Sequence, residues 1–140
     1  MESKAIYNLF KFIEDKKPQY KIPFTAKLIY APETLTKEEL NVEGDLYLGD
    51  TPIQSLPNGL EVEGDLDLSY TPIQSLPDNL TVRGDLFLNV TPIQSLPNGL
   101  KVGGDLILYE TPLSKKYTTE KQLKAEYPNI KVKGDIYLKW

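Results

Sequence analysis

Five aspartates are the residues whose type and spacing are best suited to chemistry. Each follows a glycine, at intervals of 20, 20, 20 and 30 residues, and they are Asp45, Asp65, Asp85, Asp105 and Asp135. Stacked carboxylates could serve a glycosidase, hold cations, or accept backbone N–H groups at a bend. Catalysis needs carboxyl groups with different pKa values, which identical environments do not provide, and no calcium-loop pattern surrounds these aspartates. We therefore expect each carboxylate to accept a hydrogen bond from a backbone N–H in its own turn.

Composition excludes most other catalytic groups. The chain of 140 residues contains no cysteine and no histidine. It therefore has no thiol nucleophile, no imidazole base and no Cys/His zinc site. We predict a protein that is not an enzyme, with no catalytic residue, no metal site and no cofactor. There is no apolar run of about 18 residues and no signal-peptide core near the start, so we expect a cytoplasmic protein without membrane contact.

The aspartates belong to an internal repeat of 20 residues. Copies begin at Leu40, Leu60, Leu80 and Leu100, and the first three of these are full. A weaker copy covers residues 21–40, and a truncated copy begins at Ile130. Such a period predicts a solenoid whose coils bury their apolar edges on one another. Alternation of apolar and polar residues over the first ten positions of a copy predicts a strand with one face inward. The T-P-I-Q-S-L-P run that follows predicts an extended return path, because its two prolines exclude a helix.

The ends of the chain depart from the repeat. Ser3 to about Lys16 is predicted to form a helix that caps the first coil. A second helix is expected near residues 118–127, because Thr119 and Gln122 fit a capping box. The predicted fold is α+β, mainly β with α caps, in one domain: a parallel β-solenoid of about five to six 20-residue coils. Its parts are a helical cap at 1–20, repeats at 21–113, a helical insertion at 114–129 and a last strand at 130–140.

Each coil carries a run that in the first full copy reads Leu46-x-Leu48-x-x-Thr51-x-Ile53-x-x-Leu56-Pro57. This run resembles a leucine-rich repeat of the short bacterial class with a Leu-Pro signature. That family carries Asn where this chain has Thr, so its asparagine ladder cannot be carried over to this chain, and we expect the Thr hydroxyls to do a similar job. The blocks also resemble repeats in uncharacterised phage and prophage proteins. That likeness implies a viral or mobile-element origin and a location in the cytoplasm of a host cell.

The copies differ mainly on one face of the predicted strand. Across residues 40–59, 60–79 and 80–99, thirteen of 20 positions are identical and seven differ. Apart from a turn pair at 58–59, the variable positions lie on or beside the outward face, at 41, 43, 47, 49 and 50. The scaffold is therefore kept while the displayed face changes.

The outward face carries a column of mostly apolar residues, one per coil. This aromatic column is Tyr47, Asp67, Phe87, Ile107 and Tyr137, with Tyr70 and Tyr109 beside it. Parallel strands stack about 4.8 Å apart, so neighbours in the column touch. Exposed patches of this kind mark binding surfaces, although the aromatic rings could instead shield the sheet or pack on the terminal helices. We predict that the column binds a partner protein and that Glu43, Glu61 and Glu63 steer its approach.

Charge is distributed unevenly along the chain. Residues 31–70 hold ten acidic residues and one lysine, whereas residues 71–140 hold nine basic and seven acidic residues. The acidic half could steer a basic partner, mimic nucleic acid or only keep the chain soluble. Because Arg83 is the single arginine, specific nucleic-acid binding is not expected.

These features together predict a non-enzymatic module that binds a folded protein. With the phage resemblance, the partner would be a protein of the host cell, and inhibition of a host defence protein is one concrete form. The alternatives are a structural or virion assembly component and a carbohydrate-binding module. The last strand, at 130–140, has an uncovered edge, which also allows a homodimer through that edge.

Overall fold

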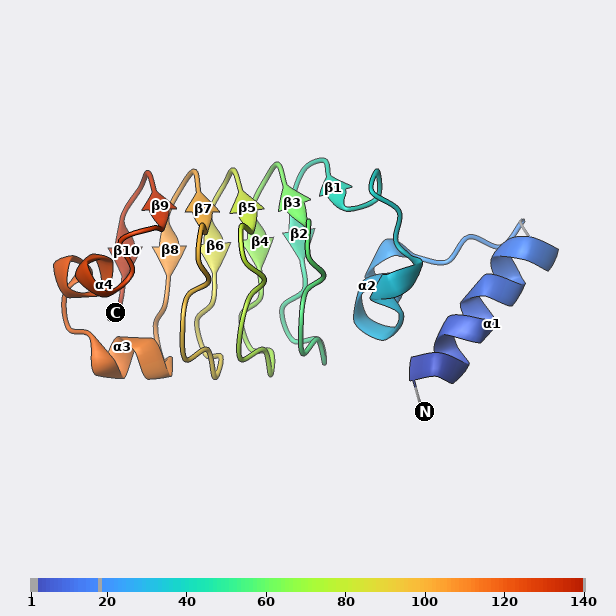
Figure 1. Ribbon diagram of the computed structural model, residues 1–140. Coiled ribbons are helices and arrows are strands. Elements are labelled where there is room, and N and C mark those ends of the chain that lie inside the picture. Colours follow the sequence, from blue (N-terminus) through green and yellow to red (C-terminus); the bar gives the residue numbers. More distant parts are fainter. Residues whose placement is uncertain (1–2, 18, 140) are drawn as a thin grey trace.

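The computed structural model describes residues 3–17 and 19–139 (Figure 1). The helices are α1 (Ser3–Lys16), α2 (Phe24–Tyr30), the 3-10 helix η1 (Pro32–Thr34), α3 (Pro112–Lys116) and α4 (Glu120–Glu126). The strands are β1 (Asn41–Val42), β2 (Leu46–Tyr47), β3 (Glu61–Val62), β4 (Leu66–Asp67), β5 (Thr81–Val82), β6 (Leu86–Phe87), β7 (Lys101–Val102), β8 (Leu106–Ile107), β9 (Lys131–Val132) and β10 (Ile136–Tyr137).

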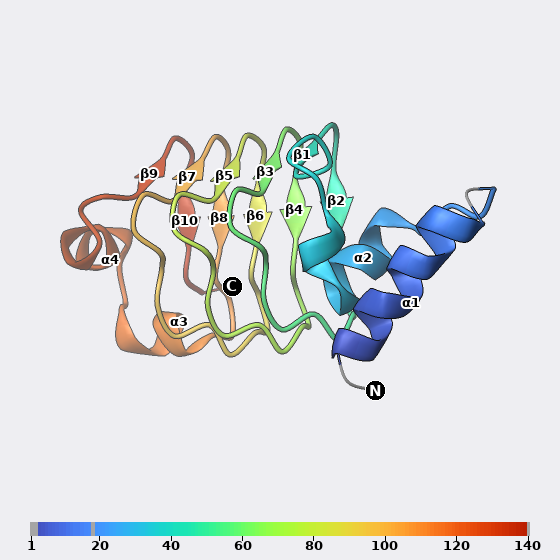
Figure 2. The same cartoon turned by 45° about the vertical axis from the view of Figure 1, so that its right-hand side comes forward.

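Each coil contributes one strand to each of two parallel sheets. Sheet A has the order β1-β3-β5-β7-β9, and sheet B has the order β10-β8-β6-β4-β2. Equivalent positions of the repeat pair with each other, so that Leu66 lies between Leu46 and Leu86. The strands of each sheet follow one another along the solenoid axis in both views (Figures 1 and 2). The predicted α+β class and the parallel β-solenoid of stacked coils are confirmed.

Regular coils occupy the middle of the chain. Within the described residues, the complete 20-residue coils are the three at 40–59, 60–79 and 80–99, so the prediction of five to six is wrong. The weaker copy at 21–40 forms α2 and η1 instead. Pro23 directly precedes α2 and Pro32 opens η1, where proline favours the start of a helix. After β8 the return path is replaced by α3 and α4, and β9 and β10 end the solenoid.

The core lies between the sheets and the return path. The leucines predicted to face inward on sheet B are buried, and Leu66 and Leu68 have no exposed surface. In the first coil, Leu40 and Val42 are only half-buried. Ile73 and Leu76 of the return path close the core from the other side. The Thr71 hydroxyl donates to the Leu68 carbonyl oxygen at 2.7 Å, and the same bond is made by Thr51, Thr91 and Thr111. These hydroxyls therefore fix the bend within one coil rather than link neighbouring coils.

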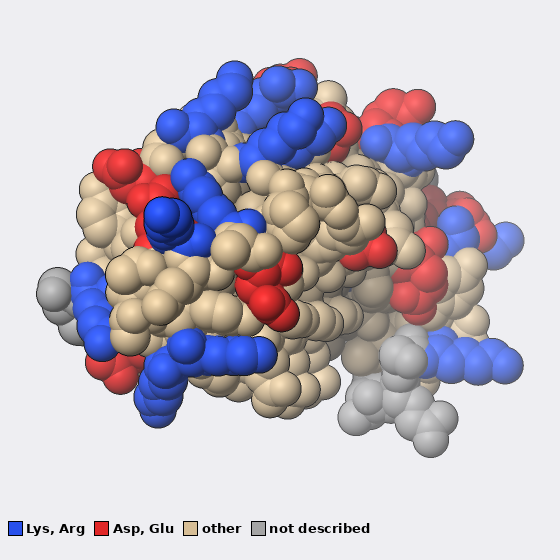
Figure 3. All heavy atoms as spheres, turned by 60° about the vertical axis from the view of Figure 1, so that its left-hand side comes forward, with Lys and Arg blue, Asp and Glu red and all other residues tan. Residues whose placement is uncertain are grey.

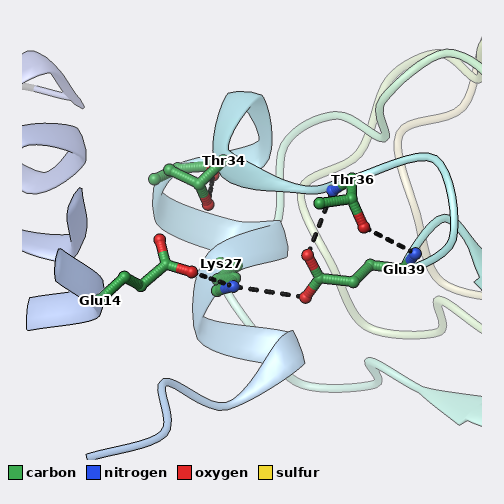
Figure 4. Close-up of polar contacts among 6 residues, drawn as sticks. Glu14, Lys27, Thr34, Thr36 and Glu39 are labelled. Atoms are coloured by element: carbon green, nitrogen blue, oxygen red, sulfur yellow. Dashed lines mark hydrogen bonds and ion pairs between the residues drawn. The ribbon is translucent and has the colours of Figure 1, made fainter. Parts of the chain in front are cut away.

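Helix α2, rather than α1, closes the N-terminal end of the core. Leu28 of α2 is buried in the core, whereas α1 has the predicted bounds but contributes none of its described residues to the core. In both views α2 lies between α1 and the coils (Figures 1 and 2). Lys27 joins the helices to the first coil, because its Nζ donates to Glu14 Oε2 at 2.9 Å and to Glu39 Oε2 at 3.3 Å (Figure 4).

Both C-terminal helices begin with a capping box. The predicted box is confirmed at α4, where Thr119 Oγ1 accepts the Gln122 N–H at 3.1 Å. The box at α3, formed by Thr111 and Ser114, is missing from the sequence-based prediction, because Thr111 and the proline after it have the form of another return path. The predicted last strand is present as β9 and β10, but Trp140, its final residue, lies outside the described residues. None of the described helices combines the length and apolar character needed to cross a membrane.

Candidate functional site

The five aspartates form a ladder that links the coils at the corner between the sheets. Asp45 Oδ1 accepts the Asp65 N–H at 2.7 Å, and the same bond continues from Asp65 to Asp85, from Asp85 to Asp105 and from Asp105 to Asp135. The predicted acceptance of a backbone N–H is confirmed, but the donor lies in the next coil and not in the same turn. The carboxylates are thus placed to hold adjacent coils in register. In the described part of the chain, no group of acidic residues has an arrangement suited to a metal ion.

The glycines before the last four aspartates make room for this ladder, whereas Gly44, before the first, has open space around it and a left-handed φ of 81°. A Cβ atom at Gly64 would collide with Asp45 Oδ1, and one at Gly84 would collide with Asp65 Oδ1. Gly104 and Gly134 meet the same obstacle in later coils. In the later coils the Gly-Asp pair is therefore explained by packing and hydrogen bonding between coils, whereas the sequence predicted a bond within one turn.

The aromatic column lies on the outer face of sheet B. Its members are the outward residues of β2, β4, β6, β8 and β10, and parallel pairing places Phe87 between Asp67 and Ile107. Tyr47 is 65% exposed and Tyr137 is 38% exposed at the two ends, while the central members are half-buried by their neighbours. The structure therefore brings together all five residues that the sequence predicted for the column.

The tyrosines of the column are held in place by neighbouring groups. The Tyr47 hydroxyl donates to Asp45 Oδ2 at 2.9 Å, and this bond raises the pKa of Tyr47. The backbone N–H of Asp65 and then the Tyr47 hydroxyl lower the pKa of the Asp45 carboxyl. At the other end, the rings of Tyr109 and Tyr137 lie 6.2 Å apart between centroids at an angle of 57°, a favourable aromatic pair. The aspartate ladder thus borders the column and orients its first ring.

Asp67 interrupts the apolar surface of the column in the second coil. Its Oδ1 accepts the Ser69 N–H at 2.9 Å and the Ser69 hydroxyl at 2.6 Å. These local bonds allow a carboxylate to stand in the column without a cation beside it. Phe87, Ile107 and Tyr137 therefore form a continuous apolar stretch, and Tyr47 lies beyond the carboxylate.

A second row of displayed residues follows sheet B at the bend before each threonine. These residues adopt left-handed backbone conformations, with φ of 61° at Asp50, 58° at Tyr70, 57° at Val90 and 54° at Glu110. Glycine or asparagine would adopt this conformation at lower cost, and a β-branched residue such as valine is especially unfavourable. Tyr70 is 56% exposed. The backbone therefore does not explain why these side chains are present.

The three predicted steering glutamates lie apart from the column. Glu61 is an outward residue of β3 in sheet A, and Glu43 and Glu63 stand at the end of sheet A just before the Gly-Asp corner. All three are exposed. The alternation over ten residues predicts one strand with one outward face. In the structure, the Gly-Asp corner divides these residues between sheet A and sheet B, whose outward faces have different neighbours. The candidate residues are therefore distributed over both sheets.

The terminal helices do not cover the two ends of the column or Tyr70, as their exposures show. In the C-terminal insertion, Tyr117 packs edge-on against Tyr127 with ring centroids 6.3 Å apart. The alternative that the column packs on the terminal helices therefore fails for Tyr47, Tyr70 and Tyr137.

Comparison with known proteins adds no assignment to this site. The chain matches no protein-family model, no curated protein and no solved structure. The resemblance to leucine-rich repeats and to phage repeats thus stays a prediction from the residues.

Proposed function

We propose that this protein is a non-enzymatic binding module that docks the outer face of sheet B on a partner protein. The observation that supports this proposal is the aromatic column, whose end residues Tyr47 and Tyr137 stay exposed on a rigid sheet, with Tyr70 beside them. Tyrosine, tryptophan and arginine are the residues that most often dominate binding energy in protein interfaces. An exposed aromatic row is therefore better explained by a partner than by the fold alone.

The rigidity of the scaffold supports docking without large rearrangement. Coils are joined by backbone bonds such as Leu66 N–H to the Asp85 carbonyl oxygen at 2.9 Å and by the aspartate ladder. A preformed surface loses little conformational entropy on binding, so the column residues can contribute most of their burial energy to affinity. Each apolar side chain that becomes buried in the interface would contribute about 1.5–3 kcal/mol.

The sequence resemblances extend this proposal to a particular kind of partner. A phage or prophage origin would place the protein in the cytoplasm of a host cell, where a folded host protein is the partner and inhibition of a host defence protein is the outcome. The leucine-rich-repeat assignment belongs to the same extension. Both rest on the residues of the repeat alone.

The test is recovery of a partner from native host lysate by the immobilised full-length chain, followed by titration with the purified partner. The variant Phe87→Asp/Tyr137→Asp changes two outward column positions to the residue that stands at the equivalent position of the second coil, Asp67. The matched control is Tyr20→Asp/Tyr30→Asp, which alters two exposed aromatic residues outside sheet B. Circular dichroism first establishes that all variants fold.

We expect the wild type and the control to bind the same protein. The column variant should bind this protein with an affinity at least about 100-fold lower. Equal binding by the column variant would refute the docking face. A glycan array and the oligomeric mass in solution test the two alternatives, carbohydrate binding and assembly.

A further inference from the structure

A cluster of cations occupies the C-terminal half of sheet A, on a different face from the aromatic column. Lys101 and Lys131 are the outward residues of β7 and β9, and they lie directly opposite each other in the parallel pairing. Arg83 and Lys133 stand at the corner-side end of the same sheet, and all four side chains are exposed. Within the described part of the chain, none of the four forms an ion pair. We call these four residues the basic cluster.

The basic cluster surrounds a shallow hollow. The hollow has a volume of about 250 Å³ and is lined by the four cations together with Thr81, Val82, Val102 and Gly103. Figure 3 shows Lys and Arg side chains gathered along the upper edge of this end of the molecule. The positive charge is therefore concentrated around one depression rather than spread evenly over the sheet.

Gly103 creates the gap at the centre of the cluster. In other coils this position carries a long side chain, as at Glu63, Arg83 and Lys133. A Cβ atom at Gly103 would collide with the Arg83 carbonyl oxygen, so the local backbone accepts only glycine. The hollow between Arg83 and Lys133 is thus built into the fold of the fourth coil.

The cluster is unfavourable without a ligand. Like charges directly opposite each other on neighbouring strands are destabilising, and Lys101 and Lys131 are such a pair. Arg83 and Lys133 add further positive charge around the same space. An anion between these side chains would remove the repulsion and form charge-assisted hydrogen bonds with them.

We propose that this hollow binds a compact polyphosphate group, a diphosphate or triphosphate, of a small molecule. The cluster spans three strands, about 10 Å at a spacing of about 4.8 Å, which suits two or three linked phosphates. Four cations in so short a span match the charge density of linked phosphates better than that of separate carboxylates. On sheet A, Glu61 and Glu63 end the positive region on its N-terminal side.

The lining also argues against nucleic acid as the ligand. Single-stranded nucleic acid is usually held by aromatic rings that stack on its bases, and no aromatic residue lines this hollow. The phosphate chain is therefore the recognised part. Because the site lies on sheet A, this inference does not depend on the docking face of sheet B.

Isothermal titration calorimetry with inorganic triphosphate tests the proposal on the full-length chain. The test variants are Lys101→Gln/Lys131→Gln and, independently, Arg83→Gln. The control is Lys4→Gln/Lys11→Gln, which removes the same charge from two exposed lysines of α1. Orthophosphate, a short single-stranded oligonucleotide and an oligoglutamate peptide are titrated in parallel.

Wild type and control should bind triphosphate, more tightly than orthophosphate and less tightly as salt is raised. The Lys101→Gln/Lys131→Gln variant should lose about tenfold or more in affinity, while its melting temperature without ligand stays equal to or above that of wild type. No binding by wild type, or equal binding by both test variants, overturns the site. Tighter binding of the oligonucleotide, or equal binding of oligoglutamate, overturns the choice of a compact polyphosphate.

Discussion

The aspartate ladder gives the sharpest quantitative prediction, at its central member. Asp85 Oδ1 accepts the Asp105 N–H at 2.7 Å, and its own N–H donates to Asp65 Oδ1 at 2.7 Å. The substitution Asp85→Ala removes the first bond and leaves the second. The substitution Asp85→Asn keeps an oxygen acceptor in the same place and removes only the charge. Comparison of the two variants separates the hydrogen bond from the electrostatic repulsion along the ladder.

Two opposing effects determine how much each substitution changes the free energy of unfolding. The lost bond, from a backbone N–H to a charged acceptor, is worth about 1.5–3 kcal/mol. Repulsion from each of the two neighbouring carboxylates, about 4.8 Å away, is about 0.9 kcal/mol in water and about half of that at physiological salt. Asp85→Ala should therefore lower the free energy of unfolding by about 0.5–2 kcal/mol. Asp85→Asn should stay within about 0.5 kcal/mol of wild type, because lost charge assistance and lost repulsion offset each other.

Urea unfolding followed by circular dichroism measures both variants. Asp78→Ala is the control, since Asp78 Oδ1 accepts the Asn98 N–H at 3.2 Å, a longer bond that joins the coils at 60–79 and 80–99. Asp78→Ala should lower the free energy of unfolding by less than Asp85→Ala does. If Asp85→Ala is as stable as Asp85→Asn or more so, the bond between coils does not stabilise the solenoid and the reasoning is wrong.

Three further predictions follow from local geometry. Gly84→Ala should lower the free energy of unfolding in urea by about 2 kcal/mol or more, because its Cβ would collide with the aspartate of the preceding coil. Val90→Asn should raise the free energy of unfolding by about 1 kcal/mol, because φ of 57° suits asparagine better than valine. Calorimetry should show this as a higher melting temperature. Partial burial opposes ionisation of Glu39, but the Thr36 N–H and the Lys27 ammonium lower its pKa below the usual 4.5. The contribution of the Glu39 carboxylate to stability is therefore complete above about pH 4.5 and is lost as pH falls through its lowered pKa. Between about pH 6 and pH 3, the free energy of unfolding of Glu39→Gln should therefore fall less than that of wild type.

The regular coils were predictable because the sequence has two periods, a repeat of 20 residues and an alternation of apolar and polar residues, and both indicate stacked strands. The 20-residue recurrence specifies the stacking, and alternation around Val62, Leu66 and Leu68 specifies which side chains are buried. The capping box at Thr119 also identified its helix, since the signal is local. Helices α2 and α3 were not predicted, because proline near a helix start and proline in an extended segment look alike in sequence.

The site was predictable in part for the same reason. The column members share one position of the repeat, so parallel stacking brings them together whatever the details of each coil. The separation of Glu61 from Tyr47 depends on a corner between strands, and alternation continues through that corner without a break. The hydrogen bonds of the ladder join residues 20 or 30 positions apart, which only the register reveals. The basic hollow depends on the missing side chain of Gly103 and on cations from three different coils.

The left-handed row explains how a repeat can keep its scaffold and still vary its surface. Asp50, Tyr70, Val90 and Glu110 share one backbone conformation within a few degrees of φ, although their side chains include two carboxylates, a phenol and an aliphatic group. A backbone held by the threonine bond and by core packing on both sides imposes this conformation on whatever residue is present. The left-handed conformation costs about 1–2 kcal/mol at Tyr70, Val90 and Glu110, and glycine would avoid much of this cost. Folding alone would favour glycine or asparagine at these positions, so we include the surface that these side chains form beside the aromatic column in the docking face that we propose.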